Sequence, residues 1–516
     1  MQKQPSIFHG ALLLTGAGFF FRLVSMLFQA YLARTVGASG VGLLQLIGAV
    51  GVFSMTLGTS GVRVAAMYLS AEEYGHRRLG GIRSAMSHCI VYGMIVSTVT
   101  GIALCLSAQW LALHWVKDLR AASSLRIMGL FLPFNCLCAV MSGYYTACSR
   151  IRKLVVIEIA ERIVSLLFTA ALLQTWASGD LERACCAVTL GSSVGCVFDF
   201  FLLYASYRKD CRHYGPIPPN LSMGRRLIRL CVPLALNDIL RSGLSTCEQF
   251  LIPWGLSGAG GGRESAMADY GTIHGMVFPV MMFPAAILYS VADVLVPELS
   301  RNRAIGRQVR IQDLADKCLR MGLVFSVLVS GSLAVLSRPL GRLLYRSDAA
   351  GAYLRLFAPL VLILYMDAMV DGMHKGLGQQ LYCVRYNTIT NVMDVVLLFL
   401  LLPRYGISGY YFTFAFTHVI NFYLSIARLI KVADCTVRPG FLLRALLSGA
   451  LSVACTCLLP DCADLPGLVL RGLAFCAASF VFFTVFQVVS QSDRAWLCAL
   501  LRHSQSKSRE ASARKP

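Results

Sequence analysis

The sequence predicts an all-α polytopic membrane protein with about fourteen transmembrane helices. Three observations support this fold class. Of its 516 residues, 56% are hydrophobic and only 14% are charged, whereas soluble domains are about 25% charged. Apolar stretches follow one another along almost the whole chain, and a stretch of about 20 apolar residues spans a bilayer as a helix. The loops between these stretches alternate between strongly basic and weakly charged.

Apolar stretches define the expected membrane spans in chain order. The first, GALLLTGAGFFFRLVSMLFQAYLA, is too long for a cleaved signal peptide and ends without a small-residue cleavage site, so we expect it to remain as a helix. The seventh and eighth spans contain Pro253, Pro279 and Pro284, where a helix can break. The expected spans are 7–34, 41–69, 85–108, 123–147, 154–177, 184–207, 228–256, 267–297, 318–337, 351–376, 382–402, 407–430, 441–459 and 467–490.

Loop charges predict the orientation of the chain. Basic side chains gather in the loops that follow even-numbered spans and in the C-terminal tail. The positive-inside rule places such loops in the cytoplasm, so we expect both termini there, which requires an even number of spans. These loops account for the net charge of +21, and no basic segment is long enough to predict nucleic-acid binding. The loop cations include Arg78, Arg83, Arg150, Arg152, Lys153, Arg208, Arg212, Arg226, Arg301, Arg303, Arg307 and Arg310.

A long basic connection around 208–228 indicates where the chain divides. We expect an N-terminal six-helix bundle at 1–220, a second bundle at 221–435, an additional helix pair at 436–490 and a basic cytoplasmic tail at 491–516. Each bundle opens with a helix that polar residues interrupt. Two repeated bundles around a central site are a common transporter plan.

Ionisable and amide side chains lie inside several expected spans. A charge there costs about 2.5–3.5 kcal/mol on insertion scales, so it usually faces a bundle interior or a water-filled path. Helical spacing places some of them on shared faces, as with Asp238, Arg241 and Glu248. The candidate site residues are Arg22, Arg63, Glu161, Asp238, Arg241, Glu248, Asp367, Asp371, His374, Asn391 and Asp394.

These candidates predict two kinds of role. We assign the three arginines and Glu248 to a substrate cavity, because a guanidinium holds phosphate or pyrophosphate with a bidentate fork. The other carboxylates, with His374 and Asn391, are candidates to line the cavity or to bind a coupling H+ or Na+. For any single residue the alternative is an internal ion pair, such as Asp238 with Arg241. For Asn421 on the twelfth span, an interhelical hydrogen bond is the better explanation.

The motif search indicates no enzyme. The sequence contains no HExxH pattern and no DxD pair in a soluble loop, and the expected external loops are short. We therefore predict no catalytic residues and no cofactor. The glycine-rich run at 255–264 lacks the GK[ST] ending of a phosphate-binding loop. The 19 cysteines lie mostly in apolar spans, where they act as small hydrophobes, so we expect no metal site.

Six segments carry a resemblance to a known family. They are FFRLVSMLFQAYLARTVGASGVGLLQ (20–45), GYYTACSRIRKLVVIEIAERIVSLL (143–167), VPLALNDILRSGLSTCEQFLIP (232–253), YGTIHGMVFPVMMFPAAILYSVADVLVPELS (270–300), RPLGRLLYRSDAAGAYLRLFAPLVLILYMDAMVDGMHKGLGQQ (338–380) and LLPRYGISGYY (401–411). Together they resemble polysaccharide flippases of the multidrug/oligosaccharidyl-lipid/polysaccharide exporter superfamily. The similarity is to the group of stage V sporulation protein B, which is related to the lipid II flippases.

The resemblance implies a V-shaped, MATE-like fold of two bundles that moves a lipid-linked saccharide across the cytoplasmic membrane by alternating access. Arg22 matches an arginine in the first helix of lipid II flippases, whereas Phe28 stands where they have a second arginine. Glu161 and Glu248 match acidic positions of the sporulation-protein group. The expected partners are the pyrophosphate-bearing substrate, membrane lipid and a coupling H+ or Na+.

Three other functions remain open from sequence. A cation-coupled multidrug exporter of the same superfamily would favour an acidic, aromatic-lined cavity over arginines. A polytopic glycosyltransferase or ligase would need loops that carry catalytic groups, and the expected external loops are short. A structural protein of the cell envelope would not explain the cost of charges buried in several helices.

Overall fold

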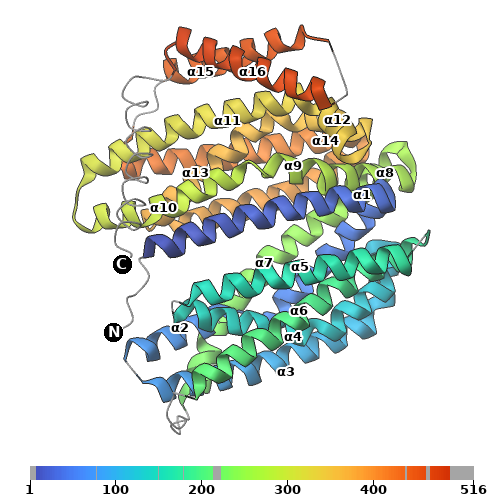
Figure 1. Ribbon diagram of the computed structural model, residues 1–516, viewed down its shortest axis with the longest axis vertical. Helices are drawn as coiled ribbons and strands as arrows, with labels where there is room; N and C mark the ends of the chain where they lie inside the picture. The colour runs from blue at the N-terminus through green and yellow to red at the C-terminus, as the bar shows by residue number, and fades with distance from the viewer. Residues whose placement is uncertain are drawn as a thin grey trace, which may run out of the picture. The chain divides into compact units, whose positions relative to one another are not determined.

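The structure is a computed structural model that describes residues 7–76, 78–148, 150–177, 179–212, 222–435, 439–460 and 465–488. Over these ranges the chain is almost entirely helical and contains no β-strand (Figure 1), which confirms the predicted all-α class. The predicted basic tail at 491–516 lies outside the described residues.

Sixteen α-helices and four short helical segments follow one another along the described chain. The α-helices are α1 (Ile7–Thr59), α2 (Val62–Gly75), α3 (Leu79–Leu111), α4 (Ala121–Ala147), α5 (Ile151–Thr175), α6 (Leu181–Cys211), α7 (Ser222–Leu256), α8 (Gly262–Tyr270), α9 (Phe278–Met282), α10 (Ala285–Ala304), α11 (Gln308–Tyr345), α12 (Asp348–Phe357), α13 (Val361–Gly376), α14 (Gln380–Ala433), α15 (Pro439–Cys457) and α16 (Leu465–Val485). The short segments are η1 (Ala112–Val116), η2 (Ser257–Gly261), η3 (Gly271–Val277) and η4 (Ala358–Leu360).

Two of the predicted loops are single-residue breaks inside long helices. Gly37 interrupts α1 with φ 75°, and Gly406 interrupts α14 with φ 54°. Glycine adopts these left-handed values without the penalty that a Cβ would bring. Each of these helices therefore consists of two arms. The first arm of α1 and both arms of α14 each correspond to one predicted span, whereas the predicted span 41–69 covers the second arm of α1 and the first half of α2. The break expected near Pro284 also occurs, since α9 ends at Met282 and α10 begins at Ala285.

By length and composition, nine helical stretches among the described residues qualify as membrane spans, or ten if one bent pair counts as a single span. Helix α5 is not among them, and it carries the charged side chains of Glu158, Glu161 and Arg162. Every predicted span nevertheless coincides with a helix, an arm of a helix or a run of consecutive helical segments, apart from residues 489–490, which are not described. The protein is a multi-pass membrane protein, and the count of about fourteen spans remains a prediction.

Internal contacts divide the chain into two compact units. Unit 1 comprises Met1–Phe283 and Thr388–Thr417, and unit 2 comprises Pro284–Asn387 and His418–Pro516. Helix α14 therefore contributes its middle to unit 1 and both ends to unit 2. The organisation into six-helix bundles with a boundary near residue 220 remains a prediction.

In unit 1, α4 packs against α2, α3 and α6, and α5 packs against α6 (Figure 1). The helices α3 and α4 approach closely at Gly101 and Gly129, where a Cβ added at Gly101 would lie 2.4 Å from the Gly129 carbonyl oxygen. Small residues allow such close packing in membranes, where lipid removes the hydrophobic drive for helices to associate.

We expect Gly101→Ala to destabilise unit 1, because its methyl group meets backbone and not a movable side chain. Overpacking of this kind costs about 1–3 kcal/mol. The thermal unfolding temperature of the purified protein in detergent measures the loss. Gly48→Ala is the matched control, since a Cβ there has no neighbour within 4 Å. Equal unfolding temperatures for the two variants would show that this helix crossing is not tight.

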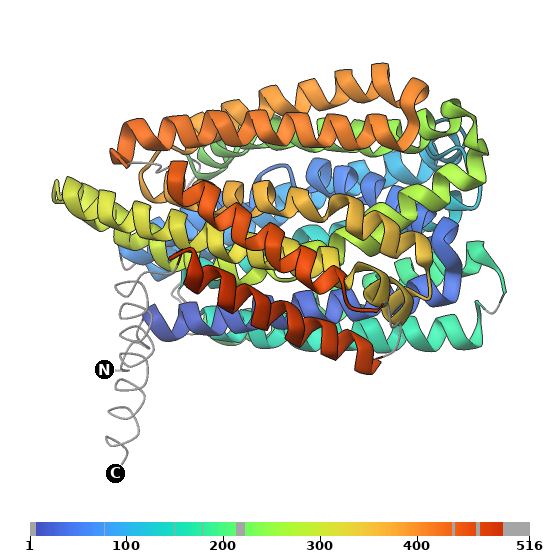
Figure 2. The same cartoon turned by 90° about the horizontal axis from the view of Figure 1, so that it is seen from above.

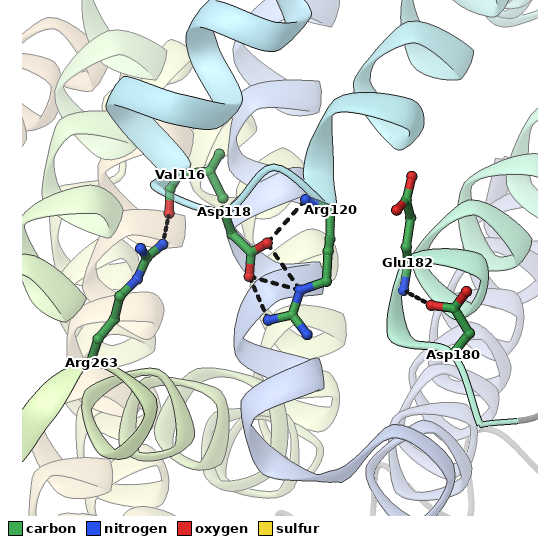
Figure 3. Close-up of polar contacts among 6 residues, drawn as sticks. All are labelled: Val116, Asp118, Arg120, Asp180, Glu182 and Arg263. Atoms are coloured by element: carbon green, nitrogen blue, oxygen red, sulfur yellow. Dashed lines mark hydrogen bonds and ion pairs between the residues drawn. The ribbon is translucent and has the colours of Figure 1, made fainter.

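The turn between α3 and α4 is organised by Asp118 (Figure 3). Its Oδ1 accepts hydrogen bonds from the backbone N–H of Arg120 at 3.0 Å and from Arg120 Nε at 3.0 Å, and Nη2 donates to Oδ2 at 2.7 Å. Arg263 of α8 donates to the Val116 carbonyl at 3.1 Å. Burial raises the pKa of Asp118, but the hydrogen bonds from Arg120 and the charges of Arg120 and Arg263 outweigh it, so the pKa lies below the ordinary 3.8.

This lowered pKa predicts a pH-dependent contribution to stability. A carboxyl whose pKa is depressed by folding stabilises the protein fully above its ordinary pKa of 3.8, and the contribution is lost as the pH falls through the lower folded-state value. Asp118→Asn should therefore lower the unfolding temperature at neutral pH, and the difference from wild type should shrink below pH 3.8. A difference that stays constant with pH would contradict this role.

In unit 2, α11 packs against α12, α13, α15 and α16 (Figures 1 and 2). Phe475 of α16 lies over Gly331 of α11, where an added Cβ would come within 2.6 Å of its ring. Arg471 of α16 is buried, and it donates to the carbonyls of Leu459 at 2.7 Å and Pro460 at 3.1 Å. This cation therefore satisfies carbonyl groups just after the end of α15, which the helix itself leaves unpaired.

Candidate functional site

Arg22 lies in the first arm of α1 and is half-buried. Its Nη1 donates to the carbonyl of Met282 at the end of α9, at 3.1 Å. The rings of Phe19 and Phe283 pack beside this bond, with centroids 5.1 Å apart. Unit 1 thus holds a guanidinium within an apolar stretch of α1, and the contact with Met282 orients it.

A second group in unit 1 joins acidic and aromatic side chains from α7, α8, η3 and α14. Glu248 lies within electrostatic range of Asp394, Tyr270 and Tyr410. Tyr270 and Tyr410 are fully buried. The Tyr410 hydroxyl forms a hydrogen bond of 3.0 Å with His274 Nε2, and the His274 ring packs at a tilt against that of Tyr270, with centroids 4.8 Å apart. We call these five residues the Glu248–Asp394 group.

Asp394 is the most enclosed carboxylate of that group, with 7% of its surface exposed. Thr417, on the second arm of α14, donates to Asp394 Oδ1 at 2.7 Å. Within the described chain, no ion pair joins Glu248 or Asp394 to a basic side chain. Two carboxylates near each other in an apolar region repel when both are charged, so uptake of a proton or a cation relieves the repulsion.

The candidates on α2 and α5 form a third group of charges in unit 1. Glu158 interacts electrostatically with Arg63, Arg162 and Asp199. Glu161 lies against Gly195 of α6, where an added Cβ would come 2.8 Å from Oε1. Arg63 itself is exposed.

Asp238 and Arg241 are both exposed on α7. Among the described ion pairs none joins them, so the alternative of an internal Asp238–Arg241 pair gains no support. They therefore remain candidates for an open surface of unit 1. The neighbouring Ser242 accepts a hydrogen bond from Thr56 of α1 at 3.3 Å, which fixes this part of α7 against α1.

In unit 2, the stripe of Asp367, Asp371 and His374 on α13 faces the second arm of α14. Asn421 donates to Asp367 Oδ2 at 2.9 Å, which confirms the interhelical hydrogen bond expected for Asn421. His374 is fully buried, and its Nε2 lies 2.9 Å from the Ser425 carbonyl. Asp371 interacts with the Cys383 thiol. The stripe is thus a polar network between two helices, in which His374 is buried and the two aspartates are half-buried.

The structure therefore distributes the predicted site residues over several groups. It brings Glu248 to Asp394 within unit 1, and it brings Asp367, Asp371 and His374 together in unit 2. Asn391 is half-buried on the same arm of α14 as Asp394. Sequence reasoning missed Tyr270, His274, Tyr410 and Thr417, although a histidine four residues after a tyrosine inside an apolar stretch was a usable signal.

Unit 2 also contains an apolar groove with a cavity of about 330 Å³. Its walls come from α11, α13, α14 and α15, and its charged members, Asp316 and Arg320, belong to α11. The apolar lining includes Leu319, Leu323, Leu362, Phe422, Ile426 and Phe441. A long hydrocarbon chain is the kind of ligand that such a lining accepts.

The model of one protein family, described as polysaccharide biosynthesis protein, matches residues 7–303, more than half of the chain. The chain belongs to this polysaccharide biosynthesis protein family. The matched region contains Arg22, Arg63, Glu161, Asp238, Arg241 and Glu248.

Known relatives of this family member agree with that assignment. Stage V sporulation protein B of Bacillus subtilis (strain 168) is 21% identical over 417 residues, covering 79% of this chain and 80% of that protein. The lipid II flippase MurJ in an inward closed conformation has a TM-score of 0.68 at 14% identity, covering 92% and 98% of the two chains. An inward-facing multidrug resistance MATE family transporter of the MOP superfamily has a TM-score of 0.61 at 12% identity, covering 86% and 98%. The fold is therefore MurJ- and MATE-like.

Proposed function

We propose that this protein is a flippase that carries a lipid-linked oligosaccharide or a peptidoglycan-type precursor across the cytoplasmic membrane by alternating access. The observation that carries the proposal is Arg22, a guanidinium held inside the first apolar helix by the Met282 carbonyl. A pyrophosphate linking a saccharide to a lipid is the anion that such a fork binds best. Transport of this kind changes no covalent bond in the substrate, so we assign no catalytic residue.

The apolar groove of unit 2 supports a lipid-linked substrate. Its lining is apolar apart from Asp316 and Arg320. Such a lining suits the hydrocarbon tail of a lipid, which stays in the bilayer while the head group crosses the membrane. A soluble sugar has no hydrocarbon chain that could occupy this apolar groove. The name of the Bacillus relative places that protein in sporulation, so we include the spore cortex among the destinations of the proposed substrate.

We assign coupling to the Glu248–Asp394 group. The described chain offers these two carboxylates no basic partner, and the Thr417 hydroxyl supplies a further oxygen at 2.7 Å from Asp394. Oxygen ligands of this kind hold a proton or Na+. Binding of that cation would favour one state of the transport cycle over the other.

A multidrug exporter is the second candidate, and the Glu248–Asp394 group also favours it. Buried tyrosines beside acidic groups attract organic cations through ring faces and charge. Arg22 opposes this alternative, since a guanidinium repels cationic drugs.

Complementation tests the proposal. Bacteria depleted of their own flippase for a lipid-linked precursor would receive this protein, and accumulated precursor in the membrane would be measured by mass spectrometry. We expect growth to be restored and the precursor pool to fall to its level before depletion. Failure to rescue by well-expressed protein, together with raised resistance to cationic drugs in an exporter-deficient strain, would establish the alternative.

A further inference from the structure

A second cavity, of about 480 Å³, opens in unit 1 between α3 and α6. Arg83, Arg208 and Arg212 line it, together with Tyr204 and Tyr207. We call it the arginine pocket. Its volume falls in the range of about 300–1,000 Å³ that is usual for small-molecule sites. None of the predicted site residues lines it.

Each wall of the arginine pocket consists of residues from one face of its own helix. On α3 the lining residues Arg83, Ser87, Ile90 and Val91 have the spacing i, i+4, i+7 and i+8. On α6 and its C-cap, the residues at 204, 207, 208, 211 and 212 have the spacing i, i+3, i+4, i+7 and i+8. Such spacings place side chains above one another on one side of a helix, so two continuous stripes face a shared cavity.

The two stripes have the same gradient from charged to apolar. Arg83 lies near the start of α3 and Arg208 near the end of α6, whereas Val91 lies about two turns further into α3. Val91 is 55% exposed and Tyr204 is 36% exposed. Cations at the helix ends, with tyrosine and aliphatic surface beyond them, match the border between lipid head groups and acyl chains.

The lining of the arginine pocket is strongly cationic. Its lining, as far as the chain is described, includes no carboxylate. The nearest acidic residue in sequence, Asp210, is not part of this lining and forms ion pairs with Arg150 and, at 3.4 Å, with Lys153. Arginines at the end of α6 also favour the helix dipole, but that effect needs neither a cavity nor the facing Arg83.

We propose that the arginine pocket binds the phosphodiester head group of an anionic glycerophospholipid. Guanidinium groups bind phosphate oxygens in pairs, and basic pockets between membrane helices on the cytoplasmic side recognise anionic head groups. The predicted orientation places this pocket on the cytoplasmic side. The inference is independent of the proposed substrate, because the pocket excludes Arg22.

Native mass spectrometry of the full-length protein in neutral detergent tests this site. The probes are dioleoyl phosphatidylglycerol, dioleoyl phosphatidylcholine and inorganic phosphate. We expect wild type to retain phosphatidylglycerol in preference to phosphatidylcholine. In the triple variant Arg83→Gln/Arg208→Gln/Arg212→Gln, the affinity for phosphatidylglycerol should fall by about 100-fold, since each arginine near an anionic lipid contributes about a factor of five.

Two further variants distinguish binding in the arginine pocket from a general attraction of anionic lipid to exposed cations. The triple variant Arg301→Gln/Arg303→Gln/Arg307→Gln removes three exposed cations from another predicted cytoplasmic loop and should bind as wild type does. Ser87→Trp keeps all three pocket arginines but fills the cavity, and it should lose the bound lipid. The proposal is overturned if both triple variants lose equal affinity, if Ser87→Trp retains the lipid, or if inorganic phosphate displaces it at equal concentration.

Discussion

Replacing Arg22 by alanine should abolish rescue in the flippase-depleted strain. Loss of a charged hydrogen-bond partner costs about 2–5 kcal/mol, which corresponds to at least about a 30-fold fall in transport of the lipid-linked precursor. Arg22→Lys should recover part of the activity, because an ammonium keeps the charge but loses the bidentate fork. Precursor accumulation and growth provide the measurement.

Arg22 also bonds to the Met282 carbonyl, so its loss has a structural component that must be separated. The unfolding temperature and membrane expression of each variant supply this second readout. Arg126→Ala is the matched control, since this arginine is exposed on α4. If Arg22→Ala folds normally and rescues as well as Arg126→Ala, the anionic head group is assigned to the wrong residue.

Asp394→Asn should uncouple transport from its driving cation. Coupling between two sites changes affinity by about 5- to 150-fold. In this variant, the ratio of the transport rate with a Na+ or pH gradient to the rate without it should fall to about one. The amide keeps the shape of the side chain and still accepts from Thr417, but it binds no proton and holds Na+ poorly. Transport in proteoliposomes, measured with and without each gradient, gives the result.

Thr417 provides a graded check on the same site. Thr417→Val removes the hydroxyl that donates to Asp394 and should weaken coupling, whereas Thr417→Ser should keep it. Asp348→Asn, at a carboxylate that is 75% exposed beside Arg342, is the control for the change of charge. A gradient response preserved in Asp394→Asn would move coupling away from this group, with the α13 stripe as the next candidate.

The sequence predicted the helices well because apolar length and glycine position are local properties. Gly37 and Gly406 mark the breaks in α1 and α14, and both lie between stretches long enough to be separate spans. What it could not predict is how short these connections are, since only a single residue leaves the helical region between the two arms of each helix.

The partners of the polar residues were harder to predict, because they depend on contacts between distant segments. Glu248 and Asp394 are far apart in the chain, and nothing local to either indicates the other. The tyrosines of that group look like ordinary apolar residues in sequence, so their burial beside carboxylates is visible only in the fold. Arg83 and Arg208 were interpreted as loop charges, because a pocket between two helix ends has no sequence signature.

The position of Arg471 determines how the protein can be shortened. Its guanidinium belongs to α16, but the carbonyls that it satisfies follow α15. Removing α16 alone would strip those carbonyls of their donor and expose the face of α11 at Gly331. The last two helices therefore depend on each other, and any truncation, natural or engineered, must keep or discard them as one hairpin.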